Sequence, residues 1–76
     1  MTTLQLGSQV RSLREAAGIS QQALGQGCGL SQAQISRIEA GVHAPGFLVM
    51  VAIAAMLGVP VERFAHADDP DPPAAP

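Results

Sequence analysis

Apolar residues at helical spacing mark the first element of the chain. Leu6, Val10, Leu13 and Ala17 follow one another at steps of four, three and four residues. These steps place the four side chains on one face of a helix. Gly18 comes next and supplies a stop signal. The pattern predicts an amphipathic first helix that buries this face against the rest of the domain.

The next predicted helix is short and rich in glycine. Ser20 can cap its start, Leu24 points inward, and the helix ends around Gly27. Gly25 and Gly27 each weaken a helix by about 1 kcal/mol relative to alanine, so tertiary packing has to compensate. We interpret Gly25 as the point where the backbone of a neighbouring helix comes close. Gly29 suits a left-handed turn position, where a side chain would be strained.

A third helix is predicted to begin with a capping box at Ser31. Its hydroxyl can accept from the backbone amide of Gln34, while the Gln34 side chain reaches back to the backbone of Ser31. Gly41 ends this helix, and residues 42–45 form a loop. Three side chains are expected to anchor the helix to the core: Leu30, Ile35 and Ile38.

Two more helices and a tail complete the predicted order. An apolar run predicts a fourth helix from about residue 46 to residue 57, stopped by Gly58. Pro60 fits the first turn of a short fifth helix that ends near Phe64. Residues 65–76 contain four prolines, three aspartates and no large apolar residue. Such a segment cannot build a packed core, so we expect a disordered tail.

The composition favours an all-α fold. The chain is 47% hydrophobic, but Phe47 and Phe64 are its only aromatic residues. Aliphatic side chains must therefore build the core, which suits closely packed helices. The alternating β-branched and polar residues of strands are missing. We predict one compact five-helix bundle over residues 4–64, followed by an acidic tail rich in proline and alanine over residues 65–76.

The cysteine content and the hydropathy indicate the cellular environment in which the protein is expected. The single cysteine excludes an internal disulfide and a two-cysteine zinc site. We interpret Cys28 as a small buried residue near a helix end, with a redox-sensing thiol as the alternative. The N-terminal residues lack the order of a signal peptide, and the apolar run 47–57 is shorter than the roughly 20 residues of a membrane span. We expect a cytoplasmic protein without cofactor, metal or membrane partner.

The net charge of −2 is unevenly distributed. Up to residue 64, four arginines and three glutamates give a formal charge of +1. Beyond residue 64, three aspartates give −3. The acidity therefore belongs to the tail, and the folded part is close to neutral. That balance is weakly cationic for a protein that binds nucleic acid.

The segment from residue 20 to residue 41 carries the candidate chemistry. In its second helix Ile35 and Ile38 are expected to point inward, while four residues occupy the opposite face: Gln32, Ala33, Ser36 and Arg37. Glutamine can pair with adenine, arginine with guanine, and alanine can pack against a thymine methyl group. The alternative is the solvated face of an ordinary helical bundle, and the face alone leaves the two readings equally open.

The spacing of three segments resembles a known family. LGSQVRSLREAAGISQ, GLSQAQISRIEAG and PGFLVMVAIAAMLGVPVERF together resemble the helix-turn-helix domain of the lambda repressor/Cro family over residues 4–64. The resemblance implies a five-helix domain whose third helix reads double-stranded DNA in the major groove. It also implies a homodimer on paired half-sites.

The resemblance also implies roles for individual residues. Gln21 would bind a phosphate and brace Gln32. Arg14 and Glu39 occupy positions that form a partly buried ion pair in family members, with two separate surface charges as the alternative. Arg37 would contact a base or a phosphate. The DNA-binding residues implied are Gln21, Ser31, Gln32, Ala33, Ser36, Arg37, Arg11 and His43.

Three departures from the family pattern matter for function. One is the acidic tail, which is expected to aid solubility, with competition against DNA phosphate as the alternative. Gly27 and the loop 42–43 stand where relatives often carry Lys or Arg. If Arg14 is paired, Arg11 and Arg37 are the main free cations near the expected groove face, which predicts weak binding by a monomer. His43 would add a contact only when protonated.

The fourth predicted helix is apolar all round. The family pattern directs six of its residues inward: Phe47, Met50, Val51, Ile53, Ala54 and Leu57. Apolar residues also fill the positions that are normally polar: Leu48, Val49, Ala52 and Ala55. A helix apolar on all sides is normally buried on all sides. We therefore expect these four residues to form a homodimer or partner interface, with a tolerated apolar surface as the alternative.

Two functions follow from the sequence. The first is a small sequence-specific DNA-binding transcriptional regulator that acts as a homodimer. The alternative is a protein-interaction module, antitoxin-like or an anti-regulator, that holds a partner protein through the fourth helix. An enzyme is not expected, because the predicted core has no Lys or Tyr and its only histidine lies in a loop. The chain also lacks GxGxxG, P-loop and HExxH motifs.

Overall fold

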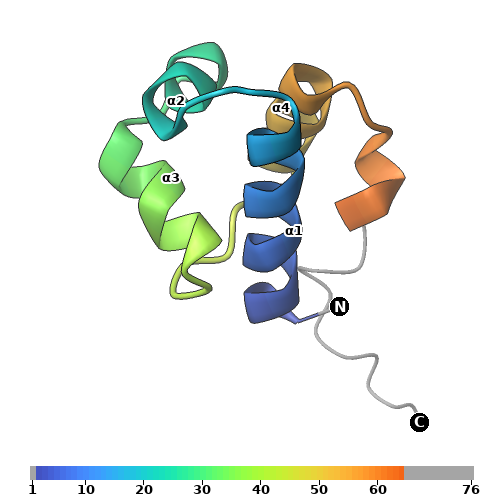
Figure 1. The fold of residues 1–76 in the computed structure, drawn as a ribbon. Helices are drawn as coiled ribbons and strands as arrows, with labels where there is room; N and C mark the ends of the chain where they lie inside the picture. Colours follow the sequence, from blue (N-terminus) through green and yellow to red (C-terminus); the bar gives the residue numbers. More distant parts are fainter. Residues whose placement is uncertain (1, 65–76) are drawn as a thin grey trace, which may run out of the picture.

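The computed structural model describes residues 2–64, which fold into four α-helices and one 3-10 helix (Figure 1). The elements in chain order are α1 (Thr3–Ala16), α2 (Gln21–Cys28), α3 (Gln32–Glu39), α4 (Phe47–Leu57) and η1 (Val61–Phe64). No strand occurs within residues 2–64. The all-α prediction is therefore confirmed for this part of the chain. The predicted tail, residues 65–76, lies outside the described residues.

The predicted fifth helix is not confirmed as an α-helix. Val61–Phe64 form four residues of 3-10 helix, in which the Arg63 amide donates to the carbonyl of Pro60 at 3.0 Å. A segment this short has too few residues to extend the i to i−4 hydrogen bonds of an α-helix, so the tighter turn forms instead. This segment is anchored to the core by Phe64, which is completely buried.

Side-chain hydrogen bonds cap the N-termini of the first three helices. Ser31 and Gln34 form the predicted capping box, with bonds of 3.1 and 2.8 Å. Ser20 accepts from the backbone amide of Ala23 at 3.0 Å. Thr2 and Gln5 form a second capping box at the start of α1, which the sequence analysis missed although T-x-x-Q carries its signature. These caps satisfy amide groups that a helix leaves unpaired.

The turn between α2 and α3 depends on Gly29. Its φ of 74° is left-handed, as predicted, and its amide donates to the carbonyl of Gly25. A side chain at Gly29 would strain this conformation. The turn therefore reverses the chain within three residues and lets α3 pack against α2 and α1.

Each helix contributes to one aliphatic core. α3 packs against α1 and α2, α4 packs against α2 and α1, and η1 packs against α4. In Figure 1 α2 and α3 lie to the left of α1, and η1 lies to its right. The buried core consists of Leu6, Val10, Leu24, Ile35, Ile38, Met50, Ile53, Ala54 and Phe64. Cys28, the last residue of α2, packs partly against this core, and burial raises the pKa of its thiol.

The apolar helix α4 is only partly buried, and its orientation differs from the predicted one. Phe47 and Val51 were expected to face inward, but they are 57% and 38% exposed. Val49 was expected to face outward, but it packs partly against the core. Leu48 is 80% exposed and Ala55 is also exposed, as expected, while Ala52 is half-buried. Among the described residues, no helix is both long enough and apolar enough to cross a membrane.

Close backbone contacts explain Gly25 better than helix propensity does. A Cβ atom at Gly25 would lie 2.7 Å from the carbonyl oxygen of Leu30 and 3.2 Å from that of Ser31. The nearby backbone is therefore the turn before α3 rather than the body of a helix. At Gly27, by contrast, a Cβ atom would meet only the flexible side chain of Met56.

We predict that Gly25→Ala lowers the free energy of unfolding by about 1–3 kcal/mol, because rigid backbone has to move. The better helix propensity of alanine does not compensate for this shift. Gly27→Ala is the matched control in the same helix, and it should cost clearly less because Met56 can rotate away. Urea denaturation followed by circular dichroism measures both values. Equal unfolding midpoints for the two variants would contradict the prediction.

Candidate nucleic-acid interface

Helix α3 has one buried face and one exposed polar face. Ile35 and Ile38 are buried, and Glu39 at the end of the helix is buried as well. Four residues on the other side are exposed to solvent: Gln32, Ala33, Ser36 and Arg37. Ser31 precedes them and is also exposed, although its hydroxyl oxygen already accepts from the Gln34 amide. Gln32, Ser36 and Arg37 offer hydrogen-bonding groups and Ala33 offers a methyl group, which are the kinds of group that can contact base edges in the major groove.

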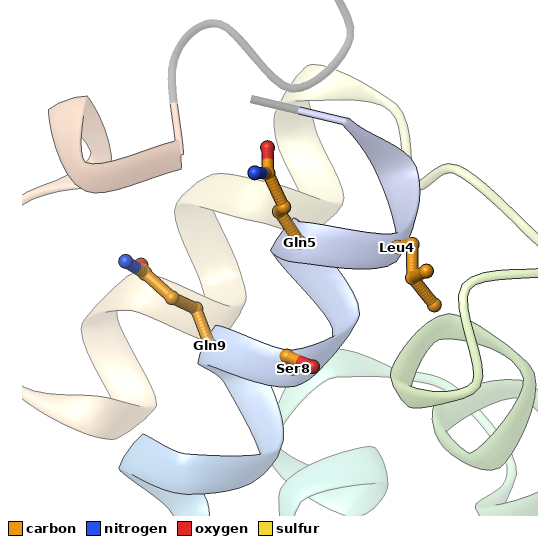
Figure 2. Close-up of a pocket in the computed structure, with 4 residues that line it drawn as sticks. All are labelled: Leu4, Gln5, Ser8 and Gln9. Atoms are coloured by element: carbon orange, nitrogen blue, oxygen red, sulfur yellow. The ribbon is translucent and has the colours of Figure 1, made fainter.

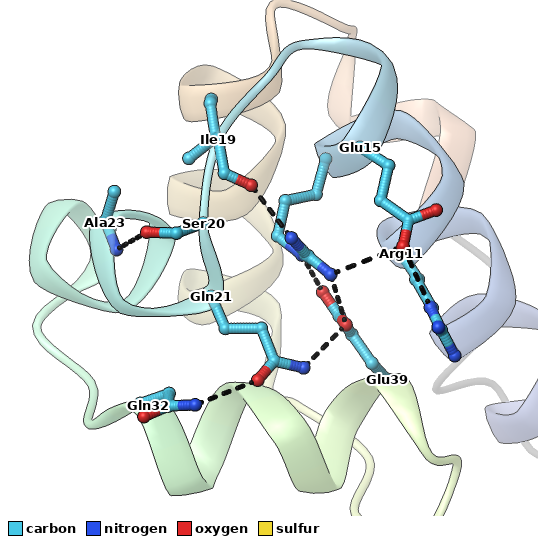
Figure 3. Close-up of polar contacts among 9 residues, drawn as sticks. Arg11, Glu15, Ile19, Ser20, Gln21, Ala23, Gln32 and Glu39 are labelled. Carbon is cyan, nitrogen blue, oxygen red and sulfur yellow. Dashed lines mark hydrogen bonds and ion pairs between the residues drawn. The ribbon is translucent and has the colours of Figure 1, made fainter.

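A buried ion pair joins α1 to the end of α3. The Arg14 Nε atom donates to Glu39 Oε2 at 2.6 Å, and Nη2 donates to Oε1 at 3.2 Å (Figure 3). The two side chains are only 11% and 4% exposed. The hydrogen bond with Glu39 raises the pKa of the Arg14 guanidinium, although desolvation by burial opposes this increase. Arg14 is therefore a structural cation rather than a contact for DNA.

The ion pair continues as a chain of amide hydrogen bonds to the start of α3. Gln21 Nε2 donates to Glu39 Oε1 at 3.0 Å. Gln32 Nε2 in turn donates to Gln21 Oε1 at 3.2 Å. Figure 3 shows the chain running from Glu39 through Gln21 to Gln32. Arg14 also donates from Nη1 to the carbonyl of Ile19 at 2.8 Å, which fixes the segment before α2.

Arg11 differs from the free cation that the sequence analysis expected. Its Nε atom lies 3.2 Å from Glu15 Oε2, one helical turn further along α1, and both side chains are largely exposed. The spacing of four residues with opposite charges could have predicted this pair. Exposed pairs of this kind contribute only about 0–1 kcal/mol, so Arg11 can exchange its partner at little cost.

Two other candidate residues lie near the exposed face of α3. Among residues 2–64, Arg37 forms no ion pair and is exposed in the last turn of α3. His43 is exposed in the loop that follows α3. The described part of the candidate interface therefore contains few cations, in agreement with the near-neutral charge of the folded part.

A pocket of about 490 Å³ lies beside α1 (Figure 2). Its described lining consists of Leu4, Gln5, Ser8 and Gln9. Within residues 2–64, the Oε1 atom of Gln9 is the buried side-chain oxygen without a hydrogen-bond partner. No acidic or basic group lies among these four residues, and the described residues contain no cluster of metal-binding side chains. None of the described lining residues can therefore act as an acid or a base.

The exposed residues of α4 form a second candidate surface, which we call the α4 apolar face. It consists of Phe47, Leu48, Val51 and Ala55. Leu48, Val51 and Ala55 follow one another at steps of three and four residues, so they lie along one side of the helix. The sequence predicts an interface on this helix at Leu48, Val49, Ala52 and Ala55. Val49 and Ala52 are partly buried, however, whereas Phe47 and Val51, which were expected to face inward, are exposed.

The fold and the two faces of α3 define a helix-turn-helix domain. A family model described as a helix-turn-helix domain matches residues 5–67. The chain belongs to this family, and it is of the lambda repressor/Cro-like kind.

One relative of this domain is a regulator with a much longer chain. The HTH-type transcriptional regulator RamB of Mycobacterium tuberculosis is 36% identical over 69 residues, which are 91% of this chain. This chain spans only 15% of the length of RamB. Whatever the remainder of RamB does therefore lies outside the comparison.

Two solved structures share the fold. The restriction-modification controller protein C.AhdI of Aeromonas hydrophila matches with a TM-score of 0.75 and 25% identity, over 79% of this chain and 87% of that chain. PlcR of Bacillus thuringiensis, solved with the peptide PapR7 and DNA, matches with a TM-score of 0.78 and 29% identity. That match covers 90% of this chain and 24% of PlcR.

We predict that Glu39→Ala lowers the free energy of unfolding by about 3–5 kcal/mol, because it leaves the buried Arg14 guanidinium without its partner. Glu15→Ala removes the same type of side chain from an exposed position, where it pairs with Arg11 and lies 3.9 Å from Arg14 Nη2, and it should cost less than about 1 kcal/mol. Thermal and urea unfolding, followed by circular dichroism, measure both losses. Similar losses for the two variants would show that burial of the Arg14–Glu39 pair has no special weight.

Proposed function

We propose that this chain is a small sequence-specific DNA-binding transcriptional regulator that binds operator half-sites as a homodimer, with α3 in the major groove. The observation that carries the proposal is the exposed polar face of α3, held in place by two buried isoleucines and a buried ion pair. The family match and the regulator RamB support it, and so does the solved complex of PlcR with DNA.

The chemistry of the polar face supports base recognition. Gln32 at the first turn of α3 can make a donor–acceptor pair with adenine, and Ala33 can pack against a thymine methyl group. Ser36 lies one turn further along and can donate to a base or a phosphate. Arg37 can form two hydrogen bonds with guanine or bind a phosphate. Recognition helices in this class contact bases through their N-terminal residues, which is where Gln32 and Ala33 lie.

Affinity is the weak point of a single copy. Phosphate contacts supply most non-specific DNA affinity, and this domain has few free cations near α3. The start of α2 can contribute, because its first backbone N–H groups have no partner within the helix and the helix dipole favours an anion there. Gln21 lies at this position. These contacts still leave a monomer that binds weakly, so we propose that two linked copies supply the missing affinity.

The α4 apolar face is the proposed contact between the two copies. Leu48 and Phe47 are 80% and 57% exposed in the single chain, and large side chains of this kind gain about 1.5–3 kcal/mol each when fully buried. A two-fold axis would place the same face of each copy against its partner. The alternative function uses the same surface for a different protein, as in an antitoxin-like or anti-regulator module, and is supported by the same exposed residues.

We predict that Gln32→Ala changes base preference at one position of the half-site, at a cost of about 1–3 kcal/mol for the preferred base. The preferred operator is first selected from a random DNA pool and then measured by fluorescence anisotropy with each base at that position. Gln26→Ala, an exposed glutamine on α2, is the matched control and should leave the preference unchanged. A uniform loss of affinity for all four bases would make Gln32 a residue that positions the helix instead of reading a base.

We predict that Leu48→Glu shifts the chain from dimer to monomer, because a buried charge without a partner opposes association. Sedimentation velocity over a range of protein concentrations measures the association state. Val42→Glu is the control, since Val42 is 72% exposed but lies outside α4. An unchanged dimer in the Leu48 variant would remove the α4 apolar face from the proposal. A wild-type chain that stays monomeric without DNA or a partner would do the same.

A further inference from the structure

In the chain of hydrogen bonds from Glu39 through Gln21 to Gln32, each atom has a fixed role as donor or acceptor. A carboxylate paired with a guanidinium only accepts hydrogen bonds. Glu39 accepts from two nitrogens of Arg14 and from Gln21, so the atom of Gln21 that faces it has to be the nitrogen. The buried ion pair therefore fixes which way the Gln21 amide is turned. Because Glu39 is only 4% exposed, water does not compete for this position.

The direction continues from Gln21 to Gln32. With its nitrogen held by Glu39, the Gln21 amide presents its oxygen to α3. The atom of Gln32 that faces this oxygen has to be a donor, and Gln32 Nε2 lies 3.2 Å from it. One N–H bond of Gln32 is thereby used inside the protein. Its other N–H bond and its oxygen Oε1 remain for a ligand.

The groups that remain on Gln32 match one purine and not the other. In the major groove, adenine offers the N7 acceptor beside the N6 donor, which complements an amide that presents one donor and one acceptor. Guanine offers two acceptors, N7 and O6, and leaves the Gln32 oxygen facing another oxygen. If the Gln32 amide were turned the other way, its oxygen would be used internally. Its two N–H groups would then suit guanine.

We infer that Glu39 is a specificity-determining positioning residue, which acts through Gln21 to orient the amide of Gln32 for adenine and against guanine. This inference rests on the proposed function, because it requires α3 to read DNA. The buried ion pair would then set base preference in addition to stabilising the fold. Glu39 does not touch the base, and it lies at the opposite end of α3 from Gln32.

The test is the ratio of affinities for operators that carry adenine or guanine at the position that Gln32→Ala identifies. The wild-type chain should prefer adenine by about 5- to 150-fold, the range that one bidentate pair provides. Gln21→Met keeps the length of the side chain but removes both hydrogen bonds. It should reduce the ratio toward the value of the Gln32→Ala variant, because the Gln32 amide can then turn over.

A second variant makes the direction itself testable. Gln21→Lys places a group that only donates between Glu39 and Gln32, so the Gln32 oxygen has to turn inward. The adenine-to-guanine ratio should then fall below that of Gln21→Met and shift toward guanine. The added positive charge raises affinity for both operators and cancels in the ratio. Glu39→Gln, which allows either amide orientation, should reduce the ratio as well, provided that circular dichroism shows a folded domain.

The outcomes separate the two proposals. If Gln32→Ala leaves base preference unchanged, α3 does not read DNA through Gln32, and the inference fails with that part of the proposed function. If Gln32→Ala changes the preference but both Gln21 variants keep the wild-type ratio, the proposed function stands and the amide chain does not set specificity. A purely structural role for Gln21 predicts that second result, with equal loss of affinity for both operators.

Discussion

The buried ion pair between Arg14 and Glu39 is the interaction on which the rest of the domain depends. It is the one place where a charged group of α3 enters the interior, and burial is acceptable only because the two charges share two hydrogen bonds. The same guanidinium also holds the carbonyl of Ile19, so the pair fixes the start of α2 as well as α1 and α3. The relative position of the two helices of the helix-turn-helix is therefore tied to one polar contact within an otherwise aliphatic core.

This arrangement separates structural charge from charge that is free for DNA. Arg14 is used inside the domain, and Arg11 has a partner on its own helix. Arg37 is then the main cation left to contact phosphate near the polar face of α3. A domain with a good reading surface and few phosphate contacts discriminates between bases better than it binds DNA in general. In the proposed function, a second copy supplies the missing affinity. The relatives RamB and PlcR are in fact much longer than this chain.

In the proposed function, the α4 apolar face supplies the contact between two copies. A domain of about 60 residues cannot cover a helix that is apolar all round, because the core behind it accommodates only one side. The uncovered side retains Phe47, Leu48 and Val51. The exposed parts of these side chains contribute no burial free energy to the single chain. Burying these exposed parts yields free energy only when two copies associate. In the proposed function, DNA binding is therefore coupled to dimerisation.

The sequence by itself determined the helices, their caps and the turn, because these depend on residues three or four positions apart. Ser31 with Gln34, Gly29 in the turn and the inward pair Ile35 and Ile38 could all be read directly. The resemblance to the family placed Arg14 near Glu39, 25 residues away, which no local pattern could do. Tertiary structure alone decided which side of α4 faces the core, since FLVMVAIAAML has no polar residue to mark the solvent side. It also decided that Gln21 reaches Glu39, because this hydrogen bond forms only where the start of α2 packs beside the end of α3.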